Sequence, residues 1–482
     1  MRSLLYLGAL LLLLGCQDTK ATKLRPAPTT GTIINYGEEE GGKGDARRAW
    51  EAKVHRAAPG VSWRAVEYQN SLNQHRINNL LRQQGQSRSD LISLAGGQVE
   101  GEWKERGAAN VAGSVHDLAY DQSADALYTV ADGGSMWRVE IEEQNWTLIN
   151  QELRFNPGLL ELVQDSTGNQ RLIALVARAP HYSDDGGVSW TAADLDGFSF
   201  TADGANIKRS LITNGGKIYL LGKENYWADY KLYVSDDNGL SFRMIYSPAQ
   251  DNTLEHILQP NHADNLILLR RNGLNLHTEL ITAEDSVITI NTSSGQGVLA
   301  DPKLLGAVLP NGDLKLMVYG IDEIHESLDT GRTWTYIGDL PDAPWRVGIH
   351  MSKANPDYLI LGNVNLYYSE NSGADWEQGA FWADYYDDVI YKLHADMMYF
   401  EDFQRPDGTY STFVSSHGGL SVNTDDPTEY LNLSLGGLNN AQYYSTATKR
   451  ETEDVIYAGS QDQGLQFQIS NFGEVENYDQ VI

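Results

Sequence analysis

One eight-residue pattern recurs four times in the middle of this 482-residue chain. The pattern Ser-x-Asp-x-Gly-x-Thr/Ser-Trp is complete at residues 183–190 and 327–334. The copy at 235–242 ends in Phe, and the copy at 369–376 departs from the pattern at two places. The copies start 52, 92 and 42 residues apart, and 92 is twice 46, so one repeat near residue 280 has lost its motif. Repeats of about 40–50 residues are typical of a β-propeller, in which each repeat forms one blade.

The residue types of the motif predict a structural role. The motif resembles the hairpin of Asp-box propellers, in which Ser and Asp side chains bond backbone N–H groups of a tight turn, Gly accepts a positive φ, and Trp packs between sheets. We therefore expect the motif residues to hold hairpins rather than to act in catalysis or bind metal. They are Ser183, Asp185, Gly187, Trp190, Ser235, Asp237, Gly239, Phe242, Ser327, Asp329, Gly331, Trp334, Ser369, Asn371, Gly373 and Trp376.

Short strand-like segments bounded by Gly, Asp and Asn continue from residue 100 to the end of the chain. They predict an all-β fold, a β-propeller of seven or eight four-stranded blades over residues 100–482. A helical hairpin is expected before it, at residues 44–99. Its first helix would begin at Asp45 and its second at Ser62. The apolar residues expected to pack are Trp50, Val54 and Ala57 in the first helix, and Val66, Leu72, Ile77, Leu80 and Leu81 in the second.

The N-terminus has the order of a bacterial lipoprotein signal. Arg2 is followed by an apolar run at residues 4–14, shorter than the roughly 20 residues that span a bilayer. Leu-Leu-Gly-Cys at 13–16 resembles the lipobox, whose Cys is lipidated; the alternative is an ordinary signal peptide. We expect a signal peptide at 1–15, a lipid bilayer bound through acylated Cys16, and a flexible tether at 16–43. The expected location is the bacterial cell envelope, with the outer membrane or cell surface favoured over the inner membrane.

Composition excludes several classes of function. Cys16 is the sole cysteine, so no internal disulfide and no cysteine nucleophile are expected. A formal charge of −29 argues against binding nucleic acid, whose phosphates need Lys and Arg. No phosphate loop, Gly-x-Ser-x-Gly or His-Glu-x-x-His motif occurs. We expect no cofactor and no metal, and the residues that would serve in catalysis remain unknown.

The motif copies resemble the Asp-box (BNR-repeat) β-propeller family, which includes sortilin-type and xyloglucanase-type propellers and many exported bacterial proteins. Residues 103–113 look like the family's opening segment, with Ala108 where the family has Pro, and residues 436–446 and 455–464 look like its Gln-Tyr-Tyr-Ser and Gln-Asp-x-Gly stretch. The resemblance covers roughly residue 100 to the end. It implies the fold and leaves the activity open.

A group of aromatic, acidic and His residues at 381–419 is the candidate ligand site. Family members often have His-x-Asp-x-His and Asp-Gly-Gly here, whereas this chain has Met398 for the second His and His417 for the Asp. Both changes weaken a metal or acid–base role. Aromatic rings beside carboxylates are also typical of a sugar-binding cleft. The candidate ligand-binding residues are Trp382, Asp384, Tyr385, Tyr386, Asp387, His394, Asp396 and His417.

Two functions remain open at this point. The first is an envelope-anchored binding module for a protein, peptide or glycan. The alternative is a xyloglucanase-type glycoside hydrolase, which needs an open groove with two facing carboxylates, lined by Trp and Tyr. A sialidase is excluded because the chain lacks the Arg-Ile-Pro motif of that class.

The pattern of residues 441–482 predicts a blade that is not complete at the end of the sequence. Residues 441–448, 455–459 and 465–469 look like three strands, and 478–482 begins another strand-like run. We expect ring closure to need a late strand paired with the first blade or the segment near Trp103. A chain truncated at Ile482 is one interpretation; the other is that Val481 and Ile482 complete the outer strand.

Overall fold

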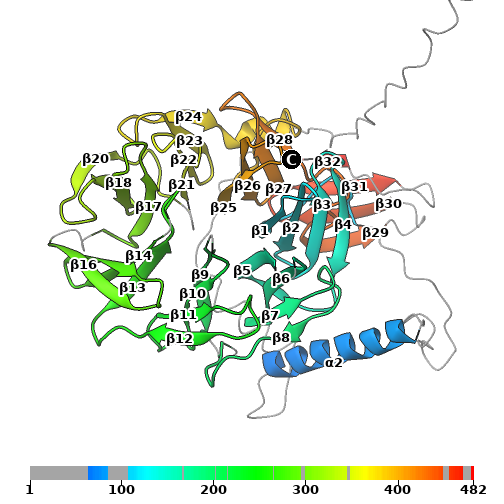
Figure 1. Cartoon of the computed structure of the whole chain (residues 1–482). Helices are drawn as coiled ribbons and strands as arrows, with labels where there is room; N and C mark the ends of the chain where they lie inside the picture. Colours follow the sequence, from blue (N-terminus) through cyan, green and yellow to red (C-terminus); the bar gives the residue numbers. More distant parts are fainter. Residues whose placement is uncertain are drawn as a thin grey trace, which may run out of the picture.

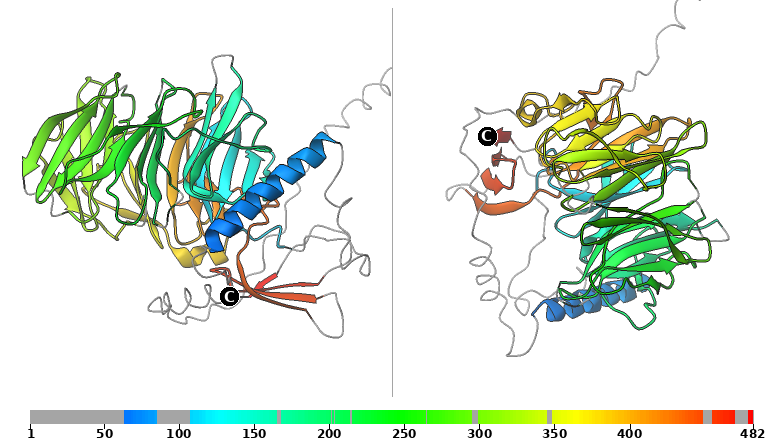
Figure 2. Two further views of the ribbon diagram at one scale, coloured as in Figure 1. Left: turned by 90° about the horizontal axis from the view of Figure 1, so that it is seen from below. Right: turned by 90° about the vertical axis from the view of Figure 1, so that its left-hand side faces the viewer.

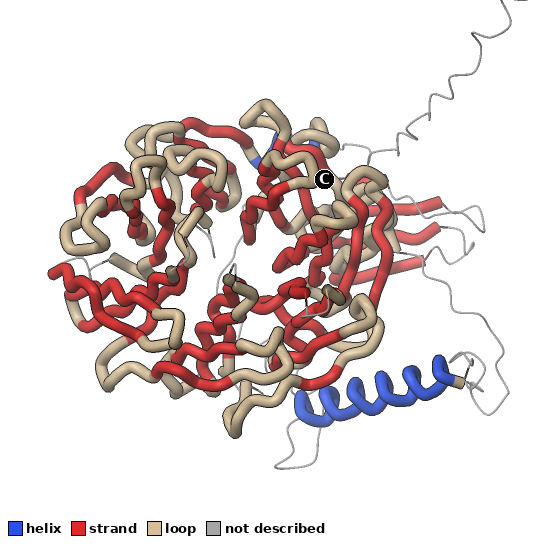
Figure 3. Tube along the Cα trace, in the orientation of Figure 1, coloured by secondary structure: helices blue, strands red, loops and turns tan. Residues whose placement is uncertain are grey.

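The computed structural model describes residues 63–84, 107–469 and 479–481, apart from gaps at 165–167, 201, 203, 214, 264, 295–298, 345–347 and 449–454. Within these residues the chain is almost entirely β, with eight four-stranded antiparallel sheets after one α-helix (Figure 3). The expected all-β propeller with four-stranded blades is confirmed to this extent. The signal segment with Cys16, the tether, the first expected helix, Ser62 and Trp103 lie outside the described residues.

Every sheet consists of four strands in sequence order. The first three sheets are β1–β4 (Val115–Asp121, Ala126–Ala131, Met136–Glu140, Asn145–Asn150), β5–β8 (Phe155–Gln164, Gln170–Val176, Ala179–Ser183, Thr191–Ala192) and β9–β12 (Asn206–Ile212, Ile218–Lys223, Lys231–Ser235, Arg243–Tyr246). The next three are β13–β16 (Thr253–Leu258, Leu266–Asn272, Asn275–Ile281, Val287–Ser294), β17–β20 (Lys303–Val308, Leu314–Tyr319, Glu323–Ser327, Thr335–Asp339) and β21–β24 (Ile349–Met351, Leu359–Gly362, Leu366–Ser369, Glu377–Ala380). The last two are β25–β28 (Tyr399–Gln404, Tyr410–Ser416, Gly419–Asn423, Tyr430–Asn432) and β29–β32 (Tyr443–Thr448, Val455–Ser460, Leu465–Ile469, Asp479–Val481).

The first seven sheets follow one another in a ring, with β1, β5, β9, β13, β17, β21 and β25 nearest its centre (Figure 1). Alternating apolar side chains from each pair of neighbouring sheets form a shared core. The sheet β25–β28 meets β1–β4 in the same way, through a core that includes Leu118, Leu127, Phe413 and Leu420. The repeat without a motif near residue 280 is present as the sheet β13–β16.

The contact between the seventh and first sheets differs from the sequence expectation. In the part of the chain that the structure describes, no late strand joins β1–β4, whose sheet contains its own four strands. Side chains make most of this contact: Trp146 Nε1 donates to Leu433 O at 2.8 Å, and Arg405 Nε donates to Asp125 Oδ1 at 2.7 Å. A backbone bond adds to it, from Trp146 N to Gly436 O at 3.0 Å. Burial of a continuous apolar core between the two sheets thus stabilises the junction without strand pairing.

The eighth sheet lies on one face of the ring, beside β1–β4 and β25–β28 (Figures 1 and 2). Ala458 packs with Ala108 and Val111 from the segment that precedes β1, and Gln463 Nε2 donates to Ala112 O at 3.4 Å. Val481 pairs with Leu465 at the outer edge of this sheet, while Ile482 and residues 470–478 lie outside the described residues.

The helix α2 (Trp63–Gln83) runs along the outside of the ring (Figure 2). Leu72 packs on the core between the first two sheets, Leu81 is buried, and the buried His75 lies 3.5 Å from Glu152. Val66, Ile77 and Leu80 are 43%, 43% and 50% exposed, so the expected apolar set is wrong for these three. The reason is that the helix docks through the face that carries Leu72 and His75. No described helix is long and apolar enough to cross a membrane.

The four motif hairpins share one hydrogen-bond pattern. In the first copy, Ser183 Oγ accepts from Gly187 N at 2.8 Å, and Asp185 Oδ1 accepts from Ser183 Oγ and from Ser189 N, both at 2.8 Å. The same bonds occur in the copies that begin at Ser235, Ser327 and Ser369. Trp190 Nε1 donates to Gly187 O at 2.7 Å. All of these contacts are internal to the hairpin.

The donors around the motif carboxylates also explain their acidity. Backbone and hydroxyl donors from Thr333 hold the pKa of Asp329 at about 2, and Ser327 adds a third donor. Gly187 has φ +93°, and a Cβ there would lie 2.8 Å from Ile149 Cγ2. Thus both the turn and the packing against the preceding sheet β1–β4 require glycine at this position.

Candidate functional site

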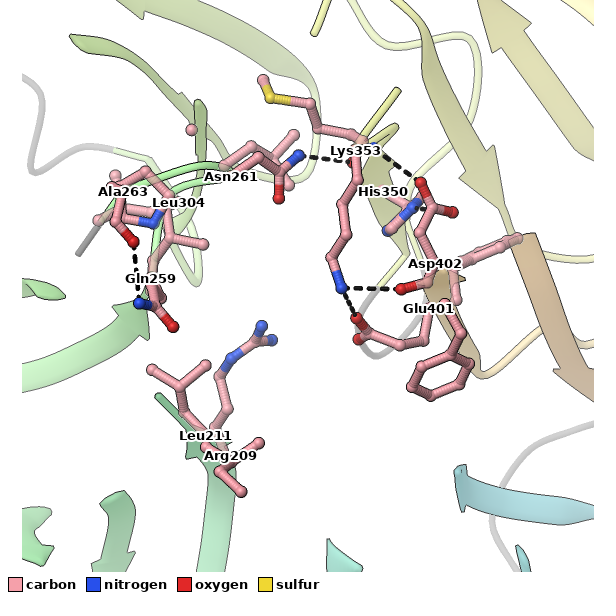
Figure 4. A pocket seen from close by; sticks show the side chains of 18 of the residues that line it. Arg209, Leu211, Gln259, Asn261, Ala263, Leu304, His350, Lys353, Glu401 and Asp402 are labelled. Atoms are coloured by element: carbon pink, nitrogen blue, oxygen red, sulfur yellow. Dashed lines mark hydrogen bonds and ion pairs between the residues drawn. The ribbon is translucent and has the colours of Figure 1, made fainter. Parts of the chain in front are cut away.

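A cavity of about 590 Å³ lies within the ring of seven sheets, between the inner strands (Figure 4). Five inner strands, β5, β9, β13, β21 and β25, contribute polar or charged side chains to its wall. These groups are Glu161, Arg209, His256, His350, Tyr399 and Glu401, joined by Lys353 just after β21. Inner strands converge on one axis, so residues far apart in sequence face a common space.

Lys353 and Glu401 form the most direct ion pair in this cavity. Lys353 Nζ lies 2.6 Å from Glu401 Oε1 and donates to Asp402 O at 2.8 Å, while Tyr399 OH donates to Glu401 Oε2 at 3.1 Å. Burial acts to raise the pKa of Glu401, but the charges of Lys353, His350 and Arg209 and the hydrogen bond from Lys353 together outweigh it, so the pKa lies below its usual value. Glu401 is therefore ionised, and both of its oxygens are engaged.

Asp402 holds this part of the wall in place. Its side chain is 1% exposed, and it accepts hydrogen bonds from Thr412 Oγ1 at 2.6 Å and from Lys353 N at 2.7 Å. His350 Nε2 lies 2.8 Å from its Oδ1. Burial opposes ionisation, yet His350 and these donors bring the pKa of Asp402 to about 2. Because Asp402 bonds both His350 and the backbone of Lys353, it orients two cavity side chains.

The pKa of Glu161, on the wall formed by β5, is shifted in the opposite direction from that of Glu401. Loss of solvation raises its pKa to about 8, although Ser210 Oγ donates to it at 3.0 Å. The negative charges of Glu401 and Asp117 act in the same direction as desolvation. Glu161 is therefore mostly protonated at pH 7.

Arg209, from β9, points its guanidinium group into the cavity (Figure 4). Its Nε is buried and has no hydrogen-bond partner among the described residues. Burial strongly lowers the pKa of His256, and the cations Arg209, Lys208 and Lys303 lower it further. The cavity therefore offers an unsatisfied cationic donor beside a neutral His and a neutral Glu, an arrangement that suits a polar ligand.

The site expected from the sequence is partly assembled on the face that carries the eighth sheet. His417 Nδ1 lies 2.7 Å from Asp462 Oδ2 and 3.0 Å from Asp396 Oδ2. His394 Nε2 and Tyr386 OH both contact Asp462 O, at 3.1 and 3.0 Å. The structure thus joins four expected residues with Asp462, which the sequence analysis did not place in this site. The four are Tyr386, His394, Asp396 and His417.

The expected residues at 382–387 lie in or beside one short helix. Trp382, Tyr385 and Tyr386 belong to the short 3₁₀ helix η4 (Trp382–Tyr386), where Tyr385 and Tyr386 are buried and pack on each other with ring centres 5.3 Å apart. Asp384 and Asp387 are exposed and lie outside the His417 cluster. The buried Tyr rings therefore offer no free face for a sugar.

The donor atoms of Asp396, His417 and Asp462 lie within 4.8 Å of one another and could hold a divalent cation. Burial acts to lower the pKa of His417, but the two carboxylates outweigh it and raise the pKa to about 9. A protonated His417 already occupies the position between the carboxylates. We interpret the cluster as an ion-paired clamp that joins the seventh sheet to the β30–β31 turn.

The central cavity was not expected from the sequence. A signal was available, because Lys208-Arg209 and Glu401-Asp402 are charged pairs inside otherwise apolar strands that begin a repeat. Charged residues in the first strand of a blade predict a site at the centre of the ring. That prediction requires the number and order of the sheets to be known.

Comparison with known proteins identifies no family: no family model and no curated protein matches the chain. Among solved structures, one titled YCF48 bound to D1 peptide is 16% identical with a TM-score of 0.42, covering 67% of this chain and 95% of that one. YCF48 from Cyanidioschyzon merolae is 13% identical with a TM-score of 0.32, covering 65% and 81%. A GH74 enzyme from Niastella koreensis is 12% identical with a TM-score of 0.30, covering 75% and 68%. These similarities assign no activity to the chain.

Proposed function

We propose that this chain is a bacterial envelope lipoprotein of the Asp-box β-propeller type that binds a protein, peptide or glycan ligand in the centre of its ring. One observation carries the proposal. The central cavity of about 590 Å³ presents a buried, unpaired Arg209 donor beside groups held in fixed positions. A buried donor without a partner is costly to the fold, so a ligand acceptor at this position would recover that free energy.

The Asp-box assignment rests on the four hairpins. Their Ser and Asp side chains bond the backbone of the same turn, as the sequence motif predicts. This use of the Asp side chains supports a structural role and leaves the cavity as the better candidate for ligand binding.

Glycoside hydrolysis is the second candidate, favoured by the opposite pKa shifts of Glu161 and Glu401. A protonated and an ionised carboxyl group are what such hydrolysis requires. Binding without turnover is favoured because Lys353 and Tyr399 engage both oxygens of Glu401, and no described Trp lines the cavity. If the protein hydrolysed a member of a polysaccharide panel and Glu161→Gln did not, hydrolysis would become the favoured function.

Filling the cavity is expected to abolish ligand binding. Gln259 lines the cavity, and Gln259→Trp should weaken the binding of any ligand found on glycan and peptide arrays at least tenfold. Gln378→Trp, the same change on the exposed outer strand β24, is the control. Affinities measured by calorimetry that are equal for both variants would place the ligand elsewhere.

The lipid anchor is expected to depend on Cys16 alone. Cys16→Ser should move the protein from the membrane fraction to the soluble exported fraction, since acyl chains supply the binding free energy. The measurement is fractionation after a carbonate wash, with wild type as reference. A Cys16→Ser protein that stays with the membrane would contradict the anchor.

A further inference from the structure

A second cavity, of about 700 Å³, opens where the inner strands begin and shares Arg209, His256 and Tyr399 with the first. Its wall carries five basic residues, which come from the β6–β7 turn, β9, the end of β10 and the start of β17. They are Arg178, Lys208, Arg209, Lys223 and Lys303. Among the described residues, two acidic residues, Asp117 and Asp301, line the same cavity. The whole chain has a formal charge of −29, so a cluster of basic side chains is unusual for its composition.

The described acidic residues nearby form salt bridges with two of these five cations. Asp301 is shared between Lys208, at 3.2 Å, and Lys303, at 3.3 Å, and Lys208 also lies 3.5 Å from Glu255. Asp117 Oδ2 accepts a hydrogen bond from Gly158 N at 2.6 Å. Among the described residues, Arg178, Arg209 and Lys223 have no salt-bridge partner. Three cations therefore remain available to an anionic ligand.

Aromatic side chains border the same opening. Lys223 Nζ lies 5.3 Å from the ring centre of Tyr230 and 5.7 Å from that of Tyr226. Between Lys223 and Tyr230, the side chains of Tyr226 and Trp227 are 66% and 89% exposed. Their rings meet edge to face, with centres 4.9 Å apart.

The backbone of the loop that carries Tyr226 and Trp227 is nevertheless fixed by local contacts. Trp227 N donates to Asn225 Oδ1 at 2.9 Å. A Cβ on Gly204, which has φ +77° and lines the cavity, would lie 2.6 Å from Tyr226 N. The loop thus packs directly on the cavity wall while two large rings stay in solvent, an arrangement typical of a recognition surface.

We propose that this cavity binds an acidic saccharide, with sugar carboxylates on the unpaired cations and sugar rings on Tyr226 and Trp227. The inference rests on the proposed binding function and names its ligand class. Guanidinium groups suit carboxylates because two parallel N–H donors match two oxygens. Asn206 and Tyr230, hydrogen-bonded to each other at 3.1 Å, add amide and phenol groups that match sugar hydroxyls.

The test is calorimetric titration of the full chain with tri-galacturonate and with its methyl ester, which has the same rings without the charges. We expect the acid to bind at least tenfold more tightly than the ester and its affinity to fall as salt is raised. Arg178→Gln combined with Lys223→Gln should weaken binding of the acid at least tenfold. Trp227→Ala should weaken both compounds about threefold to tenfold. Arg332→Gln removes an exposed cation from a motif hairpin and is the control.

Equal affinity for acid and ester, or no binding of tri-galacturonate, would overturn the inference. So would tight binding of penta-glutamate without binding of the saccharide, since the ligand would then be an acidic peptide. A neutral glycan or a peptide whose binding is lost in Gln259→Trp would overturn this inference and leave the proposed binding function standing. Failure of every arrayed ligand to bind would instead count against the binding function itself.

Discussion

Asp402→Ala is expected to lower the free energy of unfolding by about 3–5 kcal/mol, because it removes the partner of several buried groups at once. Thr412 and the backbone N–H of Lys353 would lose their acceptor inside the ring, and His350 would lose its ion-pair partner. Denaturant unfolding at pH 7 measures the loss. The control is Asp407→Ala in the same sheet, whose carboxylate caps an exposed turn through Thr409.

The effect of Asp402 should also depend on pH in a defined direction. The pKa of Asp402 is lowered from 3.8 to about 2 on folding, so the ionised form is favoured in the native state. Its stabilisation is fully present above pH 3.8 and is lost as the pH falls through 2. The difference between wild type and Asp402→Ala should therefore shrink over this interval. A difference that stays constant down to pH 2 would contradict an ionic role.

Glu161→Gln is expected to stabilise the protein at pH 9 by about 2–4 kcal/mol and to have little effect at pH 4. Folding raises the pKa of Glu161 from 4.5 to about 8, so the native state holds a proton that the unfolded chain releases. Stability must then fall as the pH rises from 4.5 to 8. Glutamine, which stays neutral, avoids that loss. Urea unfolding at the two pH values gives the comparison.

Two further variants test whether the pH-dependent change in stability is specific to Glu161. Glu401→Gln should destabilise the protein at pH 7, since Lys353 would lose its partner in the same cavity. Glu143→Gln changes an exposed residue in the β3–β4 turn and should leave the pH dependence as in wild type. If Glu161→Gln instead destabilised the protein at both pH values, Glu161 would be ionised and paired in the fold.

The expected ligand site shows where sequence reasoning stops being sufficient. His394, Asp396 and His417 fall within 24 residues of one another, and the sequence drew attention to them. Asp462 completes their cluster from the turn of another sheet, 45 positions after His417. The neighbouring tyrosines looked like ligand contacts, but they are buried because η4 needs an apolar side to pack on the ring.

Local sequence was enough to determine the hairpins and the repeat. Their hydrogen bonds join residues no more than four positions apart, as between Ser183 and Gly187, so the motif carries its own geometry. Short apolar segments bounded by Gly, Asp and Asn likewise predicted the strands, because strand and turn preferences are local properties.

Only the tertiary structure decided how the sheets meet and what lies between them. The core shared by β1–β4 and β25–β28 joins residues almost 300 positions apart, such as Leu118 and Phe413, without any strand pairing. The same arrangement brings Glu161, Arg209, Lys353 and Glu401 to one cavity. Their ionisation then depends on their burial and on one another's charge. Both follow from where each residue lies in the ring, so no pattern along the chain predicts them.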